Sequence, residues 1–135
     1  MNKEQFRTEL IEKAKEMREK AYCPYSKYRV GAAILTSSGK IYTGCNIENA
    51  SYSVTICAER TAGVKAVSEG ELEFEAIAIA VSGNTFGYPC GVCRQFLNEF
   101  ACDDMEVTVI NNKGEVNTVK LNEILPFGFK GRDMQ

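Results

Sequence analysis

Two short segments near the middle of the chain carry its clearest chemistry: Cys57-Ala58-Glu59-Arg60 and Pro89-Cys90-Gly91-Val92-Cys93. Three cysteines in this arrangement can supply three thiolates to one tetrahedral Zn²⁺ and leave its fourth position open, as in catalytic zinc sites. Glu59 follows the first cysteine by two residues, so its carboxylate would lie near the metal and stay free to transfer protons. The segments predict a site with a metal, a water and a base, in which Cys57, Cys90 and Cys93 bind the metal.

This spacing resembles that of a known enzyme family. Zinc nucleobase deaminases have a His or Cys, one spacer residue, Glu, and then Pro-Cys-x-x-Cys. Together with Gly44-Cys45-Asn46-Ile47-Glu48-Asn49-Ala50, the two segments make the chain similar to the short, all-cysteine, homotetrameric cytidine deaminases of pyrimidine salvage. The resemblance extends from the first predicted helix to the C-terminal tail. It implies hydrolysis of cytidine and 2'-deoxycytidine to uridine and 2'-deoxyuridine with release of ammonia, and one Zn²⁺ per subunit.

Length and composition limit the other classes of function. A chain of 135 residues with 44% hydrophobic residues can form one domain with a real core, and we expect a single domain over residues 1–135. Lysine and arginine number 16 against 18 acidic residues, which gives a formal charge of −2. With no basic excess to hold a phosphate backbone, nucleic acid is not an expected partner.

The six cysteines raise the alternative of a secreted disulfide framework. The first 21 residues argue against it, because charges alternate with isolated apolar residues and no continuous apolar run forms a secretory signal or a membrane span. We therefore expect a cytoplasmic protein with no membrane partner. In the reducing cytoplasm, Cys-x-x-Cys indicates metal or redox chemistry. Because the chain has no histidine, sulfur or carboxylate would have to hold any zinc.

Hydrophobic spacing and turn residues predict alternating helices and strands. Helices are predicted over about 3–21, 56–68, from 90 onward and 121–125, the first with a capping box formed by Asn2 and Gln5. Strands are predicted over 28–35, 40–46, 76–81, 105–110 and 115–120. This order indicates an α/β sandwich around a mixed sheet. The resemblance narrows it to a three-layer α/β/α sandwich with a five-stranded mixed sheet.

Two groups of small residues, in the first predicted strand and among the remaining cysteines, have possible roles in packing. Gly31-Ala32-Ala33 leaves little side-chain volume in the first predicted strand, which suits close approach of either a helix or a ligand. Cys23, Cys45 and Cys102 lie outside the zinc pattern, and we expect them to be small buried residues.

The resemblance also assigns substrate-binding residues. It implies that Asn46 and Glu48 bind the ribose hydroxyls, for which a donor amide beside an acceptor carboxylate is chemically suited. Tyr28 stands where the family usually has phenylalanine, so base stacking is retained and the hydroxyl needs a partner or access to water. Phe129 matches a tail aromatic that enters the active site of a neighbouring subunit, although Phe127 is close enough to be that residue. Both could equally be core or interface residues.

Charge and proton transfer complete the expected chemistry. Three thiolates leave zinc with a core charge of about −1, which the two helix N-termini would partly offset. In the family the residue that matches Arg60 donates hydrogen bonds to thiolate sulfur, and Arg94 is a second candidate; a solvated helix arginine is the alternative for Arg60. Glu59 would take a proton from the zinc-bound water, deliver it to N3 of cytosine and carry a second proton to the departing amine.

Three other functions compete with this one. A structural zinc module would close the metal with a fourth protein ligand. A thiol redox protein needs only Cys90-Gly91-Val92-Cys93, and neither Cys57 nor Glu59. A deaminase of another aminated heterocycle, such as a blasticidin-type nucleoside, a free base or a base in nucleic acid, is the nearest alternative, and the Asn46 and Glu48 match favours a free nucleoside.

Overall fold

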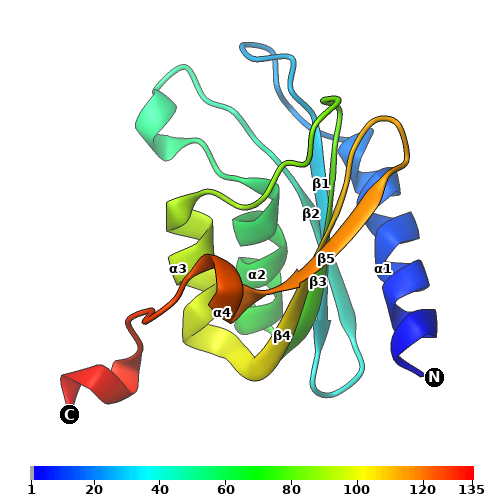
Figure 1. Cartoon of the computed structure of the whole chain (residues 1–135). Coiled ribbons are helices and arrows are strands. Elements are labelled where there is room, and N and C mark those ends of the chain that lie inside the picture. The colour runs from blue at the N-terminus through cyan, green and yellow to red at the C-terminus, as the bar shows by residue number, and fades with distance from the viewer. Residues whose placement is uncertain (1) are drawn as a thin grey trace.

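A computed structural model describes residues 2–135 and shows one sheet of five strands in the order β2-β1-β3-β4-β5 (Figure 1). Only β3 and β4 are parallel, and the other neighbouring pairs are antiparallel. The predicted five-stranded mixed sheet is confirmed; residue 1, where the predicted domain begins, lies outside the described residues. The strands have these bounds: β1 Val30–Thr36, β2 Ile41–Cys45, β3 Phe74–Val81, β4 Ala101–Ile110 and β5 Val116–Lys120.

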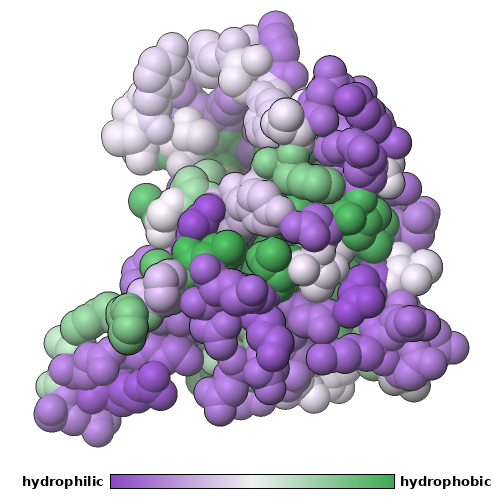
Figure 2. Space-filling model, in the orientation of Figure 1, coloured by the Kyte–Doolittle hydropathy of each residue, from purple (hydrophilic) through white to green (hydrophobic). Residues whose placement is uncertain are grey.

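Helices cover both faces of the sheet and form the expected three layers. Helix α1 packs on β1 and β3 from one side, while α2 and α3 lie on the other side with α4 beside β4 and β5 (Figure 1). The molecular surface seen in this orientation is mainly hydrophilic, with hydrophobic residues gathered near its middle (Figure 2). The α-helices have these bounds: α1 Lys3–Arg18, α2 Ala58–Ser68, α3 Gly91–Phe100 and α4 Leu121–Ile124.

The central strand β3 divides the core into two parts because its side chains alternate between the faces. Its alanines at positions 76, 78 and 80 pack with α1, whereas Ile77, Ile79 and Val81 pack with α2 and α3; Phe74 joins the second group because the ladder is irregular between Phe74 and Ala76. The predicted run over 76–81 is therefore the strand covered on both sides that its composition indicated.

Gly31 resolves the question raised by the small residues of β1. A Cβ atom at this position would lie 2.0 Å from the carbonyl oxygen of Ala14 and 2.3 Å from the backbone nitrogen of Arg18. The glycine therefore accommodates the backbone of α1 and not a ligand. Gly44 of β2 accommodates the backbone of α2 on the other face, where a Cβ would lie 2.5 Å from the backbone nitrogen of Ala62.

Element boundaries differ from the prediction in a few places. Helix α1 ends at Arg18 and not at residue 21, although its capping box between Asn2 and Gln5 forms as predicted. Strand β4 begins at Ala101, four residues before its expected start, because Phe74 pairs with Ala101 ahead of an irregularity in the ladder. Two short 3₁₀ helices were not predicted, Tyr52–Val54 and Gly131–Met134.

The three cysteines outside the zinc pattern only partly fit the expectation. Cys23 is buried, but Cys45 and Cys102 are only half-buried in the single chain. The Cys45 thiol donates a hydrogen bond to the carbonyl of Lys20, so it occupies a partly polar position at the end of β2. Among the described residues, no helix is long and apolar enough to cross a membrane.

The topology places the starts of α2 and α3 at one end of the sheet. Helix α2 leads into β3, and α3 leads from β3 into β4, so each runs opposite to the strand that follows it. Because β3 and β4 are parallel, the two helices are also parallel and both begin beyond the carboxyl end of β3. In open α/β sheets this end is where ligands bind.

Candidate active site at the start of two helices

The two helix starts bring three cysteine sulfurs together. Cys57 is the N-cap of α2, Cys90 is the N-cap of α3, and Cys93 lies in the first turn of α3. Their sulfur atoms all lie within 4.8 Å of one another. Sulfurs at tetrahedral zinc distances, about 2.3 Å from the metal, are about 3.8 Å apart, so this set fits zinc. Neither N-cap cysteine caps its helix through its side chain, so neither sulfur is taken up by a backbone N–H of that helix.

The cysteine cluster differs from a closed structural site. Within residues 2–135, no fourth histidine, cysteine, aspartate or glutamate joins the group. Cys93 is fully buried and Cys57 half-buried, but Cys90 is exposed. A metal held here would keep one position open to solvent or substrate, as catalytic zinc sites do.

Local contacts favour a thiolate at Cys57, whereas the hydrogen bond to Cys57 and burial raise the pKa of Cys93 above its ordinary value. Hydrogen bonding from Cys93 lowers the pKa of Cys57 most, burial opposes the shift, and a hydrogen bond from Arg60 lowers it further. Arg60 Nη2 lies 3.7 Å from the Cys57 sulfur and 3.2 Å from the carbonyl oxygen of Thr55, to which it also donates. The free N–H groups of the two helix starts add positive potential. Arg60 is thus half-buried beside the cluster and not a solvated helix residue.

Glu59 is the buried acid of the site. It lies in the first turn of α2 and is only 5% exposed. Burial raises its pKa to about 7, and the neighbouring negative charge of Cys57 contributes in the same direction. A carboxyl group with a pKa near neutrality can both accept and donate a proton at physiological pH, which is the property a general acid–base needs.

Tyr28 lies against the loop that leads to Cys90. A Cβ atom on Gly87 would lie 2.7 Å from the Tyr28 hydroxyl, and one on Gly83 would lie 3.0 Å from the ring carbon Cε1. Burial raises the pKa of Tyr28, and the charge of Glu59 raises it further, so the phenol lies within the electrostatic reach of the buried acid. The two glycines leave the space that this larger aromatic residue requires.

Asn46 and Glu48 are both held by the segment 22–30. The buried Asn46 donates from Nδ2 to the Tyr28 carbonyl at 2.8 Å and accepts from the Val30 nitrogen at 2.9 Å. Glu48 accepts from the backbone nitrogens of Tyr25 and Ser26 at 3.0 and 3.1 Å, and from the Ser26 hydroxyl. The Ser26 side-chain hydrogen bond is the largest cause that lowers the pKa of Glu48, which therefore stays an acceptor.

Sequence reasoning missed the residues around Glu48. A hollow of ≈ 390 Å³ is lined by Tyr25, Ser26, Glu48, Tyr52 and Thr55, and the rings of Tyr25 and Tyr52 meet edge to face at 6.1 Å. The polar loop 46–49 was the only signal for this hollow, because its other walls come from segments before and after it in the chain.

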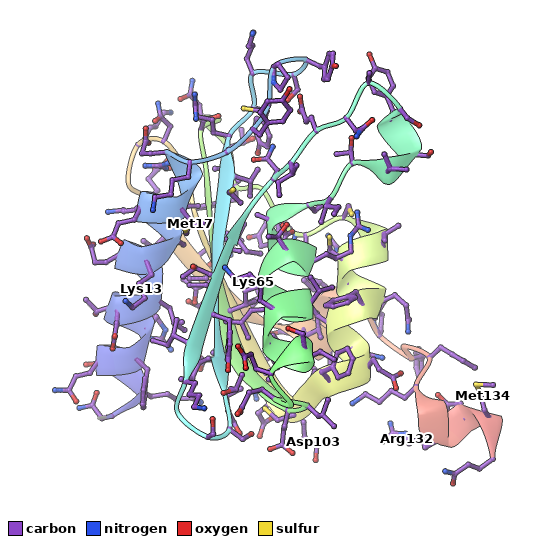
Figure 3. All side chains as sticks on the ribbon, turned by 180° about the vertical axis from the view of Figure 1, so that it is seen from behind. Lys13, Met17, Lys65, Asp103, Arg132 and Met134 are labelled. Carbon is purple, nitrogen blue, oxygen red and sulfur yellow. The ribbon has the colours of Figure 1, made fainter. Side chains whose placement is uncertain are left out.

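Neither tail aromatic reaches the cysteines of its own chain. The Phe129 carbonyl accepts hydrogen bonds from Gln95 Nε2 at 2.7 Å and Asn98 Nδ2 at 3.2 Å, while its side chain is 55% exposed. Phe127 is fully exposed. The tail leaves α4 away from the starts of α2 and α3 (Figure 1), and Figure 3 places Arg132 and Met134 on this projecting segment.

Arg94 does not contact the cluster in the way suggested by the sequence. Its guanidinium donates from Nε to the Pro89 carbonyl at 2.6 Å and from Nη1 to the Ile124 carbonyl at 2.8 Å. Charge compensation at the sulfurs therefore comes from Arg60, and Arg94 has a different set of partners.

Comparisons with known proteins agree with this geometry. Residues 4–109 match a family model described as the cytidine and deoxycytidylate deaminase zinc-binding region. The chain is 47% identical to a cytidine deaminase of Sporosarcina psychrophila, over 93% of this chain and 92% of that protein, and 45% identical to a probable cytidine deaminase of Dictyostelium discoideum, over 99% and 90%. A crystal structure of cytidine deaminase from Burkholderia pseudomallei superposes with a TM-score of 0.86 at 43% identity, covering 96% of this chain and all of that chain. This protein belongs to the cytidine and deoxycytidylate deaminase family.

Proposed function

We propose that this protein is a zinc-dependent cytidine deaminase that hydrolyses cytidine and 2'-deoxycytidine to uridine and 2'-deoxyuridine, with release of ammonia. The observation that carries the proposal is the convergence of three cysteine sulfurs within 4.8 Å of one another beside the buried carboxyl of Glu59. A thiol redox pair would need only Cys90 and Cys93. Such a pair leaves the third sulfur and the buried acid without a role, whereas metal-assisted hydrolysis uses both.

Cys57, Cys90 and Cys93 would hold the zinc, whose contribution is to activate a water for attack at C4 of the cytosine ring. Glu59 removes a proton from that water and delivers it to ring nitrogen N3. The same carboxyl group then transfers the second proton to the exocyclic amine, which leaves as ammonia. One water is consumed, its oxygen becomes O4 of uracil, and Glu59 returns to its starting protonation state. A pKa of about 7 suits both transfers.

Asn46, Glu48 and Tyr28 would bind the nucleoside. Glu48 keeps a charged carboxylate that can accept from a ribose hydroxyl, and the loop 25–26 fixes its orientation. Asn46 has one amide hydrogen beyond its bond to the Tyr28 carbonyl, which can reach a second hydroxyl. The ring of Tyr28 offers an apolar face to the base and lies near Glu59.

We further propose that residues 1–135 act as one catalytic unit in a homotetramer, with Phe129 completing the base pocket of a neighbouring subunit. The exposed Phe129 side chain and its anchored carbonyl support this, because the backbone is held on α3 while the ring stays open to a neighbouring subunit. Pyrimidine salvage in a reducing cytoplasm is the setting that keeps all three thiolates available to the metal.

The deciding experiment is the ultraviolet absorbance change on adding the purified protein to cytidine, 2'-deoxycytidine, cytosine and cytidine monophosphate in turn, with zinc measured in the same sample. We expect both nucleosides to react, and the free base and the nucleotide to stay unchanged. Stoichiometric zinc without conversion of any of the four would contradict the proposal and favour a structural zinc module.

A further inference from the structure

The side chain of Arg94 connects two segments that lie far apart in the sequence. Its Nε donates to the Pro89 carbonyl, immediately before Cys90, and its Nη1 donates to the Ile124 carbonyl at the end of α4. One guanidinium therefore links the loop that carries a cysteine of the cluster to the helix that follows the last strand. Neither bond has a role in the proton transfers assigned to Glu59.

We propose that Arg94 is a positioning residue that holds Cys90 in place for the metal. The proposal rests on the zinc site of the proposed function. It concerns how firmly the site keeps its ion, which is separate from whether the site deaminates a nucleoside.

Among the three sulfurs, Cys90 is the one that depends most on its backbone. Cys93 is fully buried and is held by packing, and Cys57 is half-buried and receives a hydrogen bond from Arg60. The Cys90 side chain is exposed, and its side-chain hydrogen bond is with the Cys57 sulfur. The position of Cys90 follows from its backbone. The preceding residue, Pro89, is fully buried, and the backbone nitrogen of Arg94 donates to the Cys90 carbonyl at 2.9 Å.

The geometry of arginine matters here more than its charge. A guanidinium presents donors at fixed angles in one plane, so it can bridge two carbonyls that face it from different directions. Lysine would place the same charge on a flexible stem and could hold only part of this arrangement. Arg60, and not Arg94, donates a hydrogen bond to the Cys57 sulfur. Arg94 therefore acts on the metal site through the Pro89 carbonyl.

Zinc release to a chromogenic chelator tests this role without any nucleoside. Groups that orient metal ligands typically change metal affinity 10- to 100-fold when removed, and we expect release from Arg94→Ala and Arg94→Gln to accelerate by a factor in that range. Arg94→Lys should restore only part of the difference. The d–d absorption of Co²⁺-substituted protein should change in the same variants, since loosening of Cys90 alters the coordination geometry.

Arg29→Ala is the matched control. Arg29 likewise donates to two backbone carbonyls, those of Glu19 and Ala21 at 3.1 and 3.3 Å, although from Nη1 alone, and these carbonyls lie just after α1. Its zinc release should equal that of the unmodified protein. Unchanged release in Arg94→Gln, which keeps most of the side-chain volume, would overturn the proposal even if Arg94→Ala failed to fold. Full restoration by lysine would also overturn it, since charge alone would then account for the effect.

Discussion

The two faces of the sheet use different residues for different tasks. On the α1 face the strands present glycine and alanine, so the helix backbone lies directly on the sheet, as at Gly31. On the opposite face large side chains such as Phe74 and Ile77 pack with α2 and α3, Gly44 lets the backbone of α2 lie on β2, and the first turn of α2 buries a titratable acid, Glu59. Both arrangements bring a helix backbone close to the sheet, but the second also accepts the cost of burying a carboxyl group beside the cysteines.

Removing the buried acid should have the largest effect on activity. Glu59→Gln keeps the size of the side chain but cannot transfer protons, and general acid–base catalysis typically contributes 10²- to 10⁴-fold. We expect kcat for cytidine to fall by roughly that factor while zinc content stays the same. Glu69→Gln, at the other end of α2, is the matched control and should keep full activity. A Glu59→Gln protein with normal turnover would refute the assignment.

A methyl group on the α1 face should instead reduce stability. In Gly31→Ala the new Cβ would lie 2.0 Å from the Ala14 carbonyl oxygen, so α1 must move away from the sheet. We expect the free energy of unfolding in urea to fall by about 1–3 kcal/mol, as for other overpacked cores. Gly39→Ala serves as a comparison because its Cβ meets no atom within 4 Å and the only strain comes from a φ of +89°. Equal losses in both would show that α1 adapts freely.

Glu48→Ala should affect binding of the sugar and leave the chemistry in place. Hydrogen bonds to charged groups contribute about 1.5–3 kcal/mol, so we expect KM for cytidine to rise by about one to two orders of magnitude with a smaller change in kcat. If free cytosine is a measurable poor substrate, its kcat/KM should be unchanged. Ser26→Ala, which removes only a neighbour of the carboxylate, should produce a weaker form of the same effect. Equal losses for cytidine and cytosine would rule out a sugar-binding role.

The smallest expected effect concerns the ionic contacts of α1 and depends on pH. Burial alone would raise the pKa of Glu106, but hydrogen bonds and charges from Arg7 and Lys3 outweigh it and lower the pKa below its ordinary value of 4.5. The pairs therefore stabilise the fold above pH 4.5, and this contribution disappears as the pH falls through the lowered pKa. Glu106→Gln should cost about 1 kcal/mol at pH 7 and much less near pH 3, measured by urea unfolding.

Local patterns were sufficient to predict most of the fold. Alternating strand patterns and the capping box at Asn2 placed the elements to within a few residues. The start of β4 was missed because Asp103 and Asp104 interrupt its apolar pattern, and only pairing with β3 shows that the strand continues through them.

Some features of the site could be predicted from the spacing of residues in the sequence, and others depend on tertiary contacts. The short spacings within each segment were enough to identify three sulfurs and one carboxyl group as a set. They could not show that Cys90 is exposed, that Asn46 bridges the backbone of Tyr28 and Val30, or that Arg94 binds carbonyls. These contacts join residues from separate elements, so no local pattern contains them.

The uneven exposure of the three sulfurs has a consequence for how the protein would be damaged. An oxidant such as hydrogen peroxide meets the Cys90 sulfur first, because Cys90 is exposed and Cys93 is buried. A sulfenic acid formed there can condense with the thiol of Cys93, three residues on, to give a disulfide and expel the ion. A thiol reductant and resupplied zinc would reverse this inactivation. Disulfide formation at Cys90 would thus prevent its irreversible oxidation to sulfinic or sulfonic acid.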